Sequence, residues 1–187
     1  EDPVWEELLD QLSVDDMLKL VEFGYGTEEI SSVNARPTYA ADSPQCLQYA
    51  YWSGVGGADS ELLNAYPCLN VIACTWNVDL AKSMGDAIGE EGSQWGVSGW
   101  YAPGLNLHRS PFGGRNFEYY SEDPVISGKM CAAMMEGASA KGLLGYVKHF
   151  ALNDQESFRQ GYLYAMNNGV CTWADEQTIR ELYLRPF

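Results

Sequence analysis

Two segments of the chain combine charged, imidazole and aromatic side chains with glycine, a mixture suited to a ligand rich in hydroxyl groups. The first, GLNLHRSPFGGRNFEYYSEDP (residues 104–124), contains Arg115, and the second, GYVKHFALNDQES (residues 145–157), contains Lys148 and His149. Asp42 follows a short apolar stretch nearer the N-terminus. A carboxylate accepts hydrogen bonds from hydroxyls, Arg and Lys donate them, and an imidazole can do either. The candidate ligand-binding residues are therefore Asp42, Arg115, Lys148 and His149.

Apolar stretches of strand length precede these residues, at Tyr39–Ala41, Trp100–Pro103 and Leu143–Val147. Loops that leave the carboxyl ends of parallel strands meet at one edge of a sheet, so we expect the four candidate residues to converge there. Each residue alone has a simpler explanation, because solvated ion pairs, strand-end lysines and structural histidines are common. Spacing alone leaves both interpretations open.

Helix-start signals recur along the chain. An Asp, Asn or Ser side chain before an apolar stripe caps the free N–H groups of a helix, and proline fits the first turn. On these signals we expect helices from Asp2–Pro3, from Ser13 up to Gly24, over Val78–Gln94, from Asp123–Pro124 to Lys141, and over Asp175–Leu184.

Two other stretches lack such signals. Leu69–Thr75 is a continuous apolar run of strand length, which predicts a strand buried on both faces. Gly24–Pro67 lacks sustained periodicity and is expected to form loops around the strand Tyr39–Ala41. Strands that alternate with helices of about ten residues or more form a parallel sheet covered by helices. The predicted fold class is α/β, with residues 1–187 as a single domain because no internal repeat divides them.

The composition narrows the classes of partner. The 11 Lys and Arg against 26 Asp and Glu give a net charge of −15, which repels nucleic-acid phosphates and anionic lipid headgroups. We therefore expect neither nucleic acid nor a membrane as partner. The net charge neither favours nor disfavours a neutral small-molecule carbohydrate, which stays the expected partner. Five cysteines without a CxxC spacing and only two histidines supply no ligand set for a metal. No nucleotide-binding glycine motif is present, so we expect no cofactor.

The N-terminus and the cysteines predict a location. The sequence EDPVWEELLDQLS is acidic and amphipathic, unlike a secretory signal peptide. An odd number of cysteines without a disulfide pattern is typical of a reducing compartment, so a cytoplasmic location is expected. The chain also begins without Met and ends on LRPF directly after a helical pattern. We expect it to be part of a longer protein.

At these residues the chain resembles glycoside hydrolase family 3, of the β-glucosidase type. The resemblance runs in order through nearly all of the chain after residue 40. The matching segments are ADSPQCL (41–47), ACTWNVDLAKSMGDAIGEEG (73–92), YAPGLNLHRSPFGGRNFEYYSEDP (101–124), KHFALNDQESFR (148–159) and RELYLRPF (180–187).

The resemblance implies a (β/α)8-type catalytic domain and retaining hydrolysis of β-linked glucosides. It implies that the hydroxyls of the sugar at the cleavage subsite are held by Asp42, Arg115, Lys148 and His149. The KHF sequence is followed by ALND rather than PGHGD, which is similar to the glucosidase-like branch and unlike the N-acetylhexosaminidase branch. One departure is Ser43, which stands where the family has the glycine of a DGP motif.

The resemblance also implies an incomplete site. Retaining hydrolysis uses two carboxyl groups about 5 to 5.5 Å apart. The family's nucleophile is an Asp in an SDW-like motif on a later strand, and its acid/base usually comes from another domain. No SDW-like motif occurs before Phe187, so no catalytic residue is expected within this chain, and the chain alone is expected to be inactive.

The chain is also too short for a complete barrel, which needs about 250 residues. We expect the N-terminal portion of a partial (β/α)8 barrel, incomplete at its C-terminus, with the remainder of the barrel and a second domain in the parent protein. Two alternatives stay open. One is a non-catalytic carbohydrate-binding or structural fragment, and the other is an enzyme that uses an internal pair such as Glu118 and Asp154.

Overall fold

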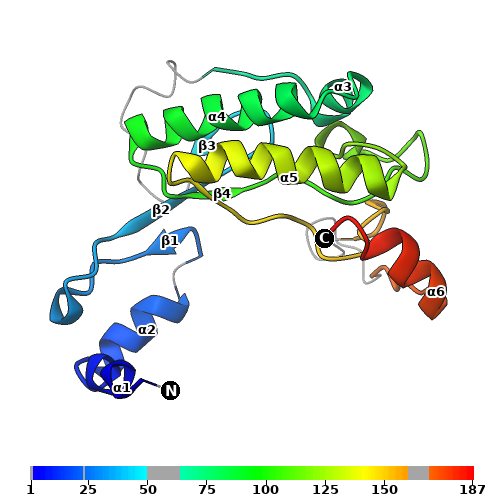
Figure 1. Ribbon diagram of the computed structural model, residues 1–187. Helices are drawn as coiled ribbons and strands as arrows, with labels where there is room; N and C mark the ends of the chain where they lie inside the picture. Colours follow the sequence, from blue (N-terminus) through cyan, green and yellow to red (C-terminus); the bar gives the residue numbers. More distant parts are fainter. Residues whose placement is uncertain (1, 23, 50–63, 160–168) are drawn as a thin grey trace.

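The computed structural model describes residues 2–22, 24–49, 64–159 and 169–187. Two long helices, α4 (Val78–Trp95) and α5 (Pro124–Ala140), lie side by side over one face of a sheet (Figure 1). The short helices α1 (Pro3–Leu9) and α2 (Val14–Glu22) lie apart from this body, and α6 (Glu176–Thr178) lies near the C-terminus. The sheet and the two long helices therefore form the frame that positions the candidate residues.

The sheet has parallel strands at its centre. β2 (Thr38–Asp42) pairs in parallel with β4 (Gly99–Tyr101), and β4 pairs in parallel with β5 (Leu144–Gly145). Two short strands, β1 (Gly26–Thr27) and β3 (Gln48–Tyr49), pair antiparallel with β2. Neighbouring parallel strands need crossover connections, and here α4 leads into β4 and α5 leads into β5. The prediction of an α/β fold with parallel strands and helices is confirmed.

Local capping explains where the long helices begin. Oδ1 of Asn77 accepts hydrogen bonds from two backbone N–H groups in the first turn of α4, at 3.0 and 3.2 Å. Oδ1 of Asp123 does the same for α5, at 2.7 and 2.8 Å. Such N–H groups have no partner within the helix itself. The helices predicted over residues 78–94 and 124–141 are confirmed, and each ends within about one residue of the predicted position.

The two long helices touch through glycine. A Cβ atom on Gly85 would lie 2.0 Å from O of Met134, and one on Gly137 would lie 2.3 Å from O of Lys82. Only a residue without a side chain allows the backbones to approach so closely. Trp100 of β4 is fully buried in the core that these helices form with the sheet. This packing fixes the strands relative to the helix layer.

Both predicted N-terminal helices are confirmed. Oδ1 of Asp2 accepts a hydrogen bond from N of Val4 at 3.1 Å where α1 begins. At α2, N of Asp16 donates to Oγ of Ser13 at 3.1 Å, and N of Ser13 donates to Oδ2 of Asp16 at 3.0 Å. This is the reciprocal capping box that the sequence predicts. Apolar side chains of these helices, including Trp5, are exposed.

The run Leu69–Thr75 is a helix rather than the predicted strand. It forms α3 (Leu69–Cys74), whose buried residues are Leu69, Ile72 and Ala73. Val71 in the same run is exposed. A spacing of three and four residues between buried positions is that of one helical face. Because Asn70 and Thr75 are the only polar residues in the run, its sequence carries no clear period by which helix and strand could be distinguished.

The C-terminal helix is present but changes type. Oδ1 of Asp175 accepts a hydrogen bond from N of Thr178 at 2.9 Å, and α6 continues as a π-helical turn over Ile179–Tyr183. The prediction of a helix over Asp175–Leu184 is thus confirmed in extent, and its second half is π-helical. Of the predicted loops in Gly24–Pro67, residues 50–63 lie outside the described residues. Within the described part of the chain, no helix is both long enough and apolar enough to span a membrane.

Candidate functional site

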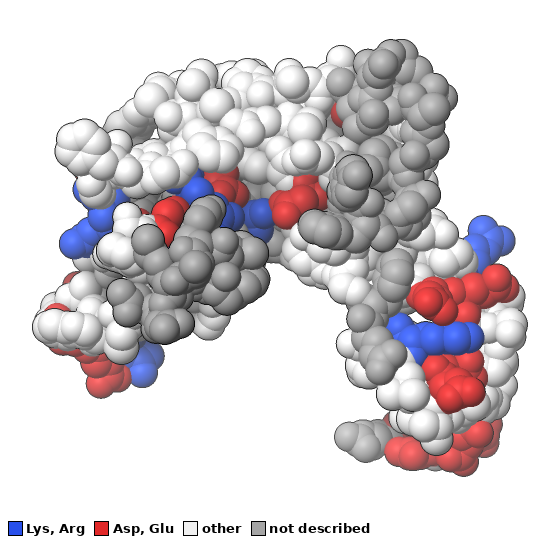
Figure 2. Space-filling view, turned by 180° about the vertical axis from the view of Figure 1, so that it is seen from behind, with Lys and Arg blue, Asp and Glu red and all other residues white. Residues whose placement is uncertain are grey.

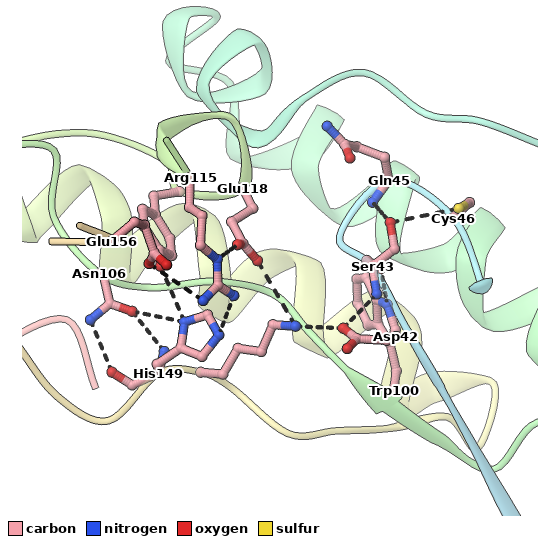
Figure 3. Close-up of polar contacts among 12 residues, drawn as sticks. Asp42, Ser43, Gln45, Cys46, Trp100, Asn106, Arg115, Glu118, His149 and Glu156 are labelled. Atoms are coloured by element: carbon pink, nitrogen blue, oxygen red, sulfur yellow. Dashed lines mark hydrogen bonds and ion pairs between the residues drawn. The ribbon is translucent and has the colours of Figure 1, made fainter. Parts of the chain in front are cut away.

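Asp42 and Lys148 meet at the carboxyl ends of the parallel strands. Figure 3 shows Asp42 beside the other polar residues of this region, among them Arg115 and Glu118. Asp42 is the last residue of β2, whereas Lys148 follows β5 and forms a parallel bridge with Gly104, just beyond β4. Nζ of Lys148 lies 2.5 Å from Oδ1 of Asp42. The side chain of Lys148 is 16% exposed and that of Asp42 is 37% exposed. The ammonium is therefore largely enclosed, while the carboxylate stays open to a ligand.

The carboxylate of Glu118 lies between two of the candidate residues, Arg115 and Lys148. Glu118 lies in the 3-10 turn Asn116–Glu118, and its side chain is 5% exposed. One carboxylate oxygen pairs with Nε of Arg115, and the other lies 3.9 Å from Nζ of Lys148. Sequence reasoning named Glu118 only as half of a possible internal acid pair. The RNFE spacing, which puts a carboxylate three residues after Arg115, is the signal that identifies its partner.

His149 is held as a neutral ring. Nη2 of Arg115 lies 2.5 Å from Nε2 of His149, and because a guanidinium only donates hydrogen bonds, Nε2 accepts. The ring proton then lies on Nδ1, which is 3.2 Å from the Tyr119 hydroxyl and 3.3 Å from Oδ1 of Asn106. Burial, assisted by the positive charges of Arg115 and Lys148, lowers the pKa of His149 to about 3. The imidazole is therefore uncharged at neutral pH.

Asn106 fixes the backbone of His149. Its side chain is buried, its Oδ1 accepts a hydrogen bond from N of His149 at 2.7 Å, and its Nδ2 donates to O of His149 at 2.9 Å. The two bonds satisfy both backbone polar groups of His149 and hold the residue in one orientation. Sequence reasoning missed Asn106, because an asparagine in a glycine-rich stretch is equally typical of an ordinary turn.

Ser43 shapes the turn beside Asp42. Its φ of 87° lies in the left-handed region, which favours glycine. N of Ser43 donates a hydrogen bond to Oδ1 of Asp42 at 2.7 Å, and O of Ser43 accepts one from Nε1 of Trp100 at 2.8 Å. Ser43 thus adopts a backbone conformation typical of glycine, and the hydrogen bond from the buried Trp100 ties this turn to the core.

The two members of the hypothetical internal acid pair have different surroundings. Glu118 is engaged by the cations of Arg115 and Lys148. Burial raises the pKa of Asp154, and the nearby Arg109 and Tyr183 oppose that increase. That these two carboxyl groups act together as acid and nucleophile stays a prediction.

The structure brings the four predicted residues together. Ion pairs and hydrogen bonds connect them through Glu118 into one set, called the polar cluster below, of Asp42, Arg115, Glu118, Lys148 and His149. Figure 2 shows basic and acidic side chains beside one another in a band below the helix-covered part of the molecule. The polar cluster offers an accessible carboxylate next to cationic donors, which suits a hydroxylated ligand. Among the described residues, no group of three or more His, Cys, Asp or Glu side chains is arranged to hold a metal ion.

Known proteins share both the sequence and the fold. Residues 26–187 match the family description "Glycosyl hydrolase family 3 N terminal domain". The chain is 41% identical over 166 residues to β-glucosidase A of Butyrivibrio fibrisolvens, which covers 88% of this chain and 18% of that protein. It is 31% identical over 184 residues to β-glucosidase B of Emericella nidulans, covering 97% of this chain and 20% of that protein.

Solved structures agree with these matches. The structure of β-glucosidase 3B from Thermotoga neapolitana in complex with glucose superposes with a TM-score of 0.81 at 33% identity, covering 97% of this chain and 26% of that chain. DesR, a β-glucosidase from Streptomyces venezuelae in complex with D-glucose, superposes with a TM-score of 0.82 at 26% identity, covering 100% of this chain and 23% of that chain. The chain spans only about a fifth to a quarter of the length of these relatives. The chain belongs to glycosyl hydrolase family 3, and its residues 26–187 match the N-terminal domain of that family.

Proposed function

We propose that the chain carries the glucose-binding half of the active site of a retaining β-glucosidase. The observation that carries this proposal is the contact between Asp42 and Lys148, two groups from separate strand ends that lie in one polar cluster. A glucose ring presents adjacent hydroxyls that both donate and accept, so it needs a carboxylate beside cationic donors. Glucose is also the ligand named for the Thermotoga neapolitana and Streptomyces venezuelae proteins.

The roles of the residues follow from their exposure and contacts. Asp42, the more exposed of the two carboxylates in the polar cluster, accepts hydrogen bonds from sugar hydroxyls, and Lys148 and Arg115 donate to neighbouring hydroxyls. Neutral His149 accepts from Arg115 and so orients its guanidinium. Glu118 holds both cations in place. Because these groups are already paired before sugar arrives, binding requires little rearrangement, which favours affinity.

In this proposal, the catalytic carboxyl groups come from outside residues 1–187. Retaining hydrolysis requires a nucleophile and an acid/base about 5 to 5.5 Å apart, and the carboxylate of Glu118 is already engaged by two cations. The Butyrivibrio fibrisolvens relative is far longer than this chain, which leaves room for the remainder of a barrel and for another domain. We therefore expect residues 1–187 alone to hydrolyse no glucoside at a measurable rate.

The test uses the full-length protein that contains this chain, with p-nitrophenyl β-D-glucoside as substrate. We expect hydrolysis, with the β-anomer of glucose as the first product in an NMR time course. Asp42→Asn should lower kcat/KM about 10- to 150-fold, because hydrogen bonds to a charged group contribute about 1.5 to 3 kcal/mol. Asp86→Asn is the matched control, since Asp86 is an exposed acidic residue on the outer helix α4.

Four outcomes would contradict the proposal. Release of the α-anomer first would exclude retention, and an unchanged kcat/KM in Asp42→Asn would exclude the role of the polar cluster. Glucose binding without turnover in the full-length protein would favour the non-catalytic binding module instead. Turnover by residues 1–187 alone would point to carboxyl groups inside the chain.

A further inference from the structure

Three tyrosine rings pack against one another on the face of the sheet opposite to the long helices. The centres of the Tyr25 and Tyr101 rings lie 4.8 Å apart, and those of Tyr101 and Tyr146 lie 4.9 Å apart. Trp100 is buried in the core between the sheet and the helices. Because side chains alternate along a strand, the next residue, Tyr101, points to the opposite face. The parallel register places Tyr101 directly beside Asp42 on that face.

Tyr25 lies next to the strand that ends at Asp42. β1 pairs antiparallel with β2, with Gly26 opposite Tyr39. The pairing continues one residue beyond β1, because N of Ala40 donates a hydrogen bond to O of Tyr25 at 3.0 Å. Residues that lie opposite each other share a face, and so do residues two positions apart in one strand. Tyr25 is thus a diagonal neighbour of Asp42, at a separation that an aromatic side chain spans.

The hydroxyl group of Tyr25 binds the carboxylate of Asp42. Burial raises the pKa of this hydroxyl, and the negative charge of Asp42 and a hydrogen bond to its carboxylate raise it further. The phenol therefore stays neutral at neutral pH and donates in this bond. Hydrogen bonds to an ionised acceptor are about twice as strong as those between neutral groups. The carboxylate is in this way tied to the segment that carries β1.

Two further contacts to Asp42 come from the loops that follow the strands. Nζ of Lys148 and N of Ser43 lie 2.5 and 2.7 Å from the same oxygen of the carboxylate, Oδ1. A carboxylate that is held at one atom can still rotate about that atom. The hydroxyl of Tyr25 approaches from a separate strand, so it restricts this rotation.

Tyr101 fixes Tyr25 in its place. The ring of Tyr101 packs on that of Tyr25, and its hydroxyl donates a hydrogen bond to O of Gly24 at 2.6 Å. Gly24 directly precedes Tyr25, so one residue of β4 holds both the backbone and the ring of Tyr25. A donor that is fixed before a ligand arrives keeps its acceptor oriented at little entropic cost.

We infer that Tyr25 is a positioning residue, whose hydroxyl orients the carboxylate of Asp42 towards the hydroxyls of the bound sugar. The inference rests on the proposed function, because it takes Asp42 as an acceptor for the sugar. It adds to the site a residue that lies directly before the range 26–187 that matches the family. If Tyr25 served only in packing, its ring would matter and its hydroxyl would not.

The experiment measures kcat/KM of the full-length protein for p-nitrophenyl β-D-glucoside. Tyr25→Phe keeps the ring and removes the hydroxyl, so kcat/KM should fall about 3- to 10-fold, the effect of one hydrogen bond. In isothermal titration calorimetry, glucose should bind more weakly by a similar factor. Tyr146→Phe is the matched control. It removes a hydroxyl from a half-exposed ring of the same stack and should change neither quantity.

A double-mutant cycle with Asp42→Ala separates positioning from packing. Asp42→Ala removes the group that Tyr25 orients, so adding Tyr25→Phe to it should change kcat/KM less than about 2-fold. Should Tyr25→Phe fail to fold, as judged by its unfolding midpoint, Tyr25→Met tests the same hydroxyl with the same expected pattern.

Two results would overturn the inference and leave the proposed function intact. One is an unchanged kcat/KM in Tyr25→Phe, and the other is an equal loss with Asp42 and with Ala at position 42, which would show a purely structural role. An unchanged kcat/KM in Asp42→Ala alone would overturn the proposed function and this inference together.

Discussion

Nζ of Lys148 and Oδ1 of Asp42 lie 2.5 Å apart, although 106 residues separate them in the chain. Strands β2 and β5 both pair in parallel with β4, so their carboxyl ends lie at the same edge of the sheet. Asp42 ends β2 and Lys148 follows β5 at that edge. Glu118 contacts the same lysine from the other side. Contacts to carboxylates on two sides hold the ammonium in one position, which is what a fixed hydrogen-bond donor requires.

Glu118→Gln should destabilise the fold and weaken glucose binding together. The substitution keeps the shape of the side chain and removes the charge that faces Arg115 and Lys148. Breaking a buried ion pair costs about 3 to 5 kcal/mol because a charge is left unpaired, so we expect a loss of unfolding free energy towards that size in urea titrations. Glu136→Gln is the matched control. Its pair with Lys82 is exposed, so the change should stay below about 1 kcal/mol. Equal effects of the two variants would contradict the role of Glu118.

His149 should stay neutral through the mildly acidic range. With a pKa of about 3, its Hε1 chemical shift should remain constant between about pH 8 and pH 5, whereas an unperturbed histidine titrates near about 6.5. The chain has only two histidines, so the signal that disappears in His149→Gln identifies the resonance. A titration midpoint near the unperturbed value would show that Arg115 does not donate to this ring.

The same shift gives His149 a pH-dependent effect on stability. Its folded-state pKa is lowered, so between about pH 6.5 and pH 3 the unfolded chain binds a proton that the folded chain does not. The contribution of His149 to the free energy of unfolding is therefore fully present above about pH 6.5 and is lost as the pH falls through that window. The unfolding midpoint of His149→Gln should depend less on pH there than that of the wild type. Parallel pH profiles for the two proteins would exclude this contribution.

Ser43→Gly should stabilise the protein. A residue with a side chain is strained at a φ of 87°, and positions of this kind cost about 1 to 3 kcal/mol. Glycine removes that strain but increases the entropy of the unfolded chain by an amount equivalent to about 0.5 to 1 kcal/mol, so we expect a net gain of about 1 kcal/mol in thermal or urea unfolding. Ser83→Gly on the exposed face of α4 is the control and should destabilise. A loss of stability in Ser43→Gly would show that the serine hydroxyl outweighs the strain.

Gly137→Ala should force the long helices apart. Its Cβ would lie 2.3 Å from O of Lys82 and 2.6 Å from N of Asp86, both of them backbone atoms. Overpacking of this kind costs about 1 to 3 kcal/mol, measured as a lower unfolding midpoint. Gly128→Ala in the same helix is the control. There the nearest atom is 3.2 Å away, and the gain in helix propensity offsets the crowding.

Local chemistry in the sequence determined the helices that begin at a side-chain cap, and it determined the candidate residues. Asn77 and Asp123 cap α4 and α5 through bonds to residues two and three positions away, so their positions follow from short-range patterns. Asp42 and Lys148 could be named because each follows an apolar stretch of strand length, and parallel strands bring such positions to one edge. Features of this kind can be predicted from short sequence segments without knowing the rest of the fold.

Tertiary packing decided what the short-range patterns left open. Leu69–Thr75 is mostly apolar, and its sequence fits a strand as well as a helix. Its place in the helix layer, with one face buried, makes it a helix. In the sequence Glu118 has the pattern of an ordinary loop carboxylate, and only the fold places it beside Lys148. Asn106 binds the backbone of His149, which lies 43 residues away in the chain, so its role also depends on the fold. In each case the structure is stabilised by burial or by a long-range contact. Both depend on residues that are distant in the chain, so no local sequence pattern predicts them.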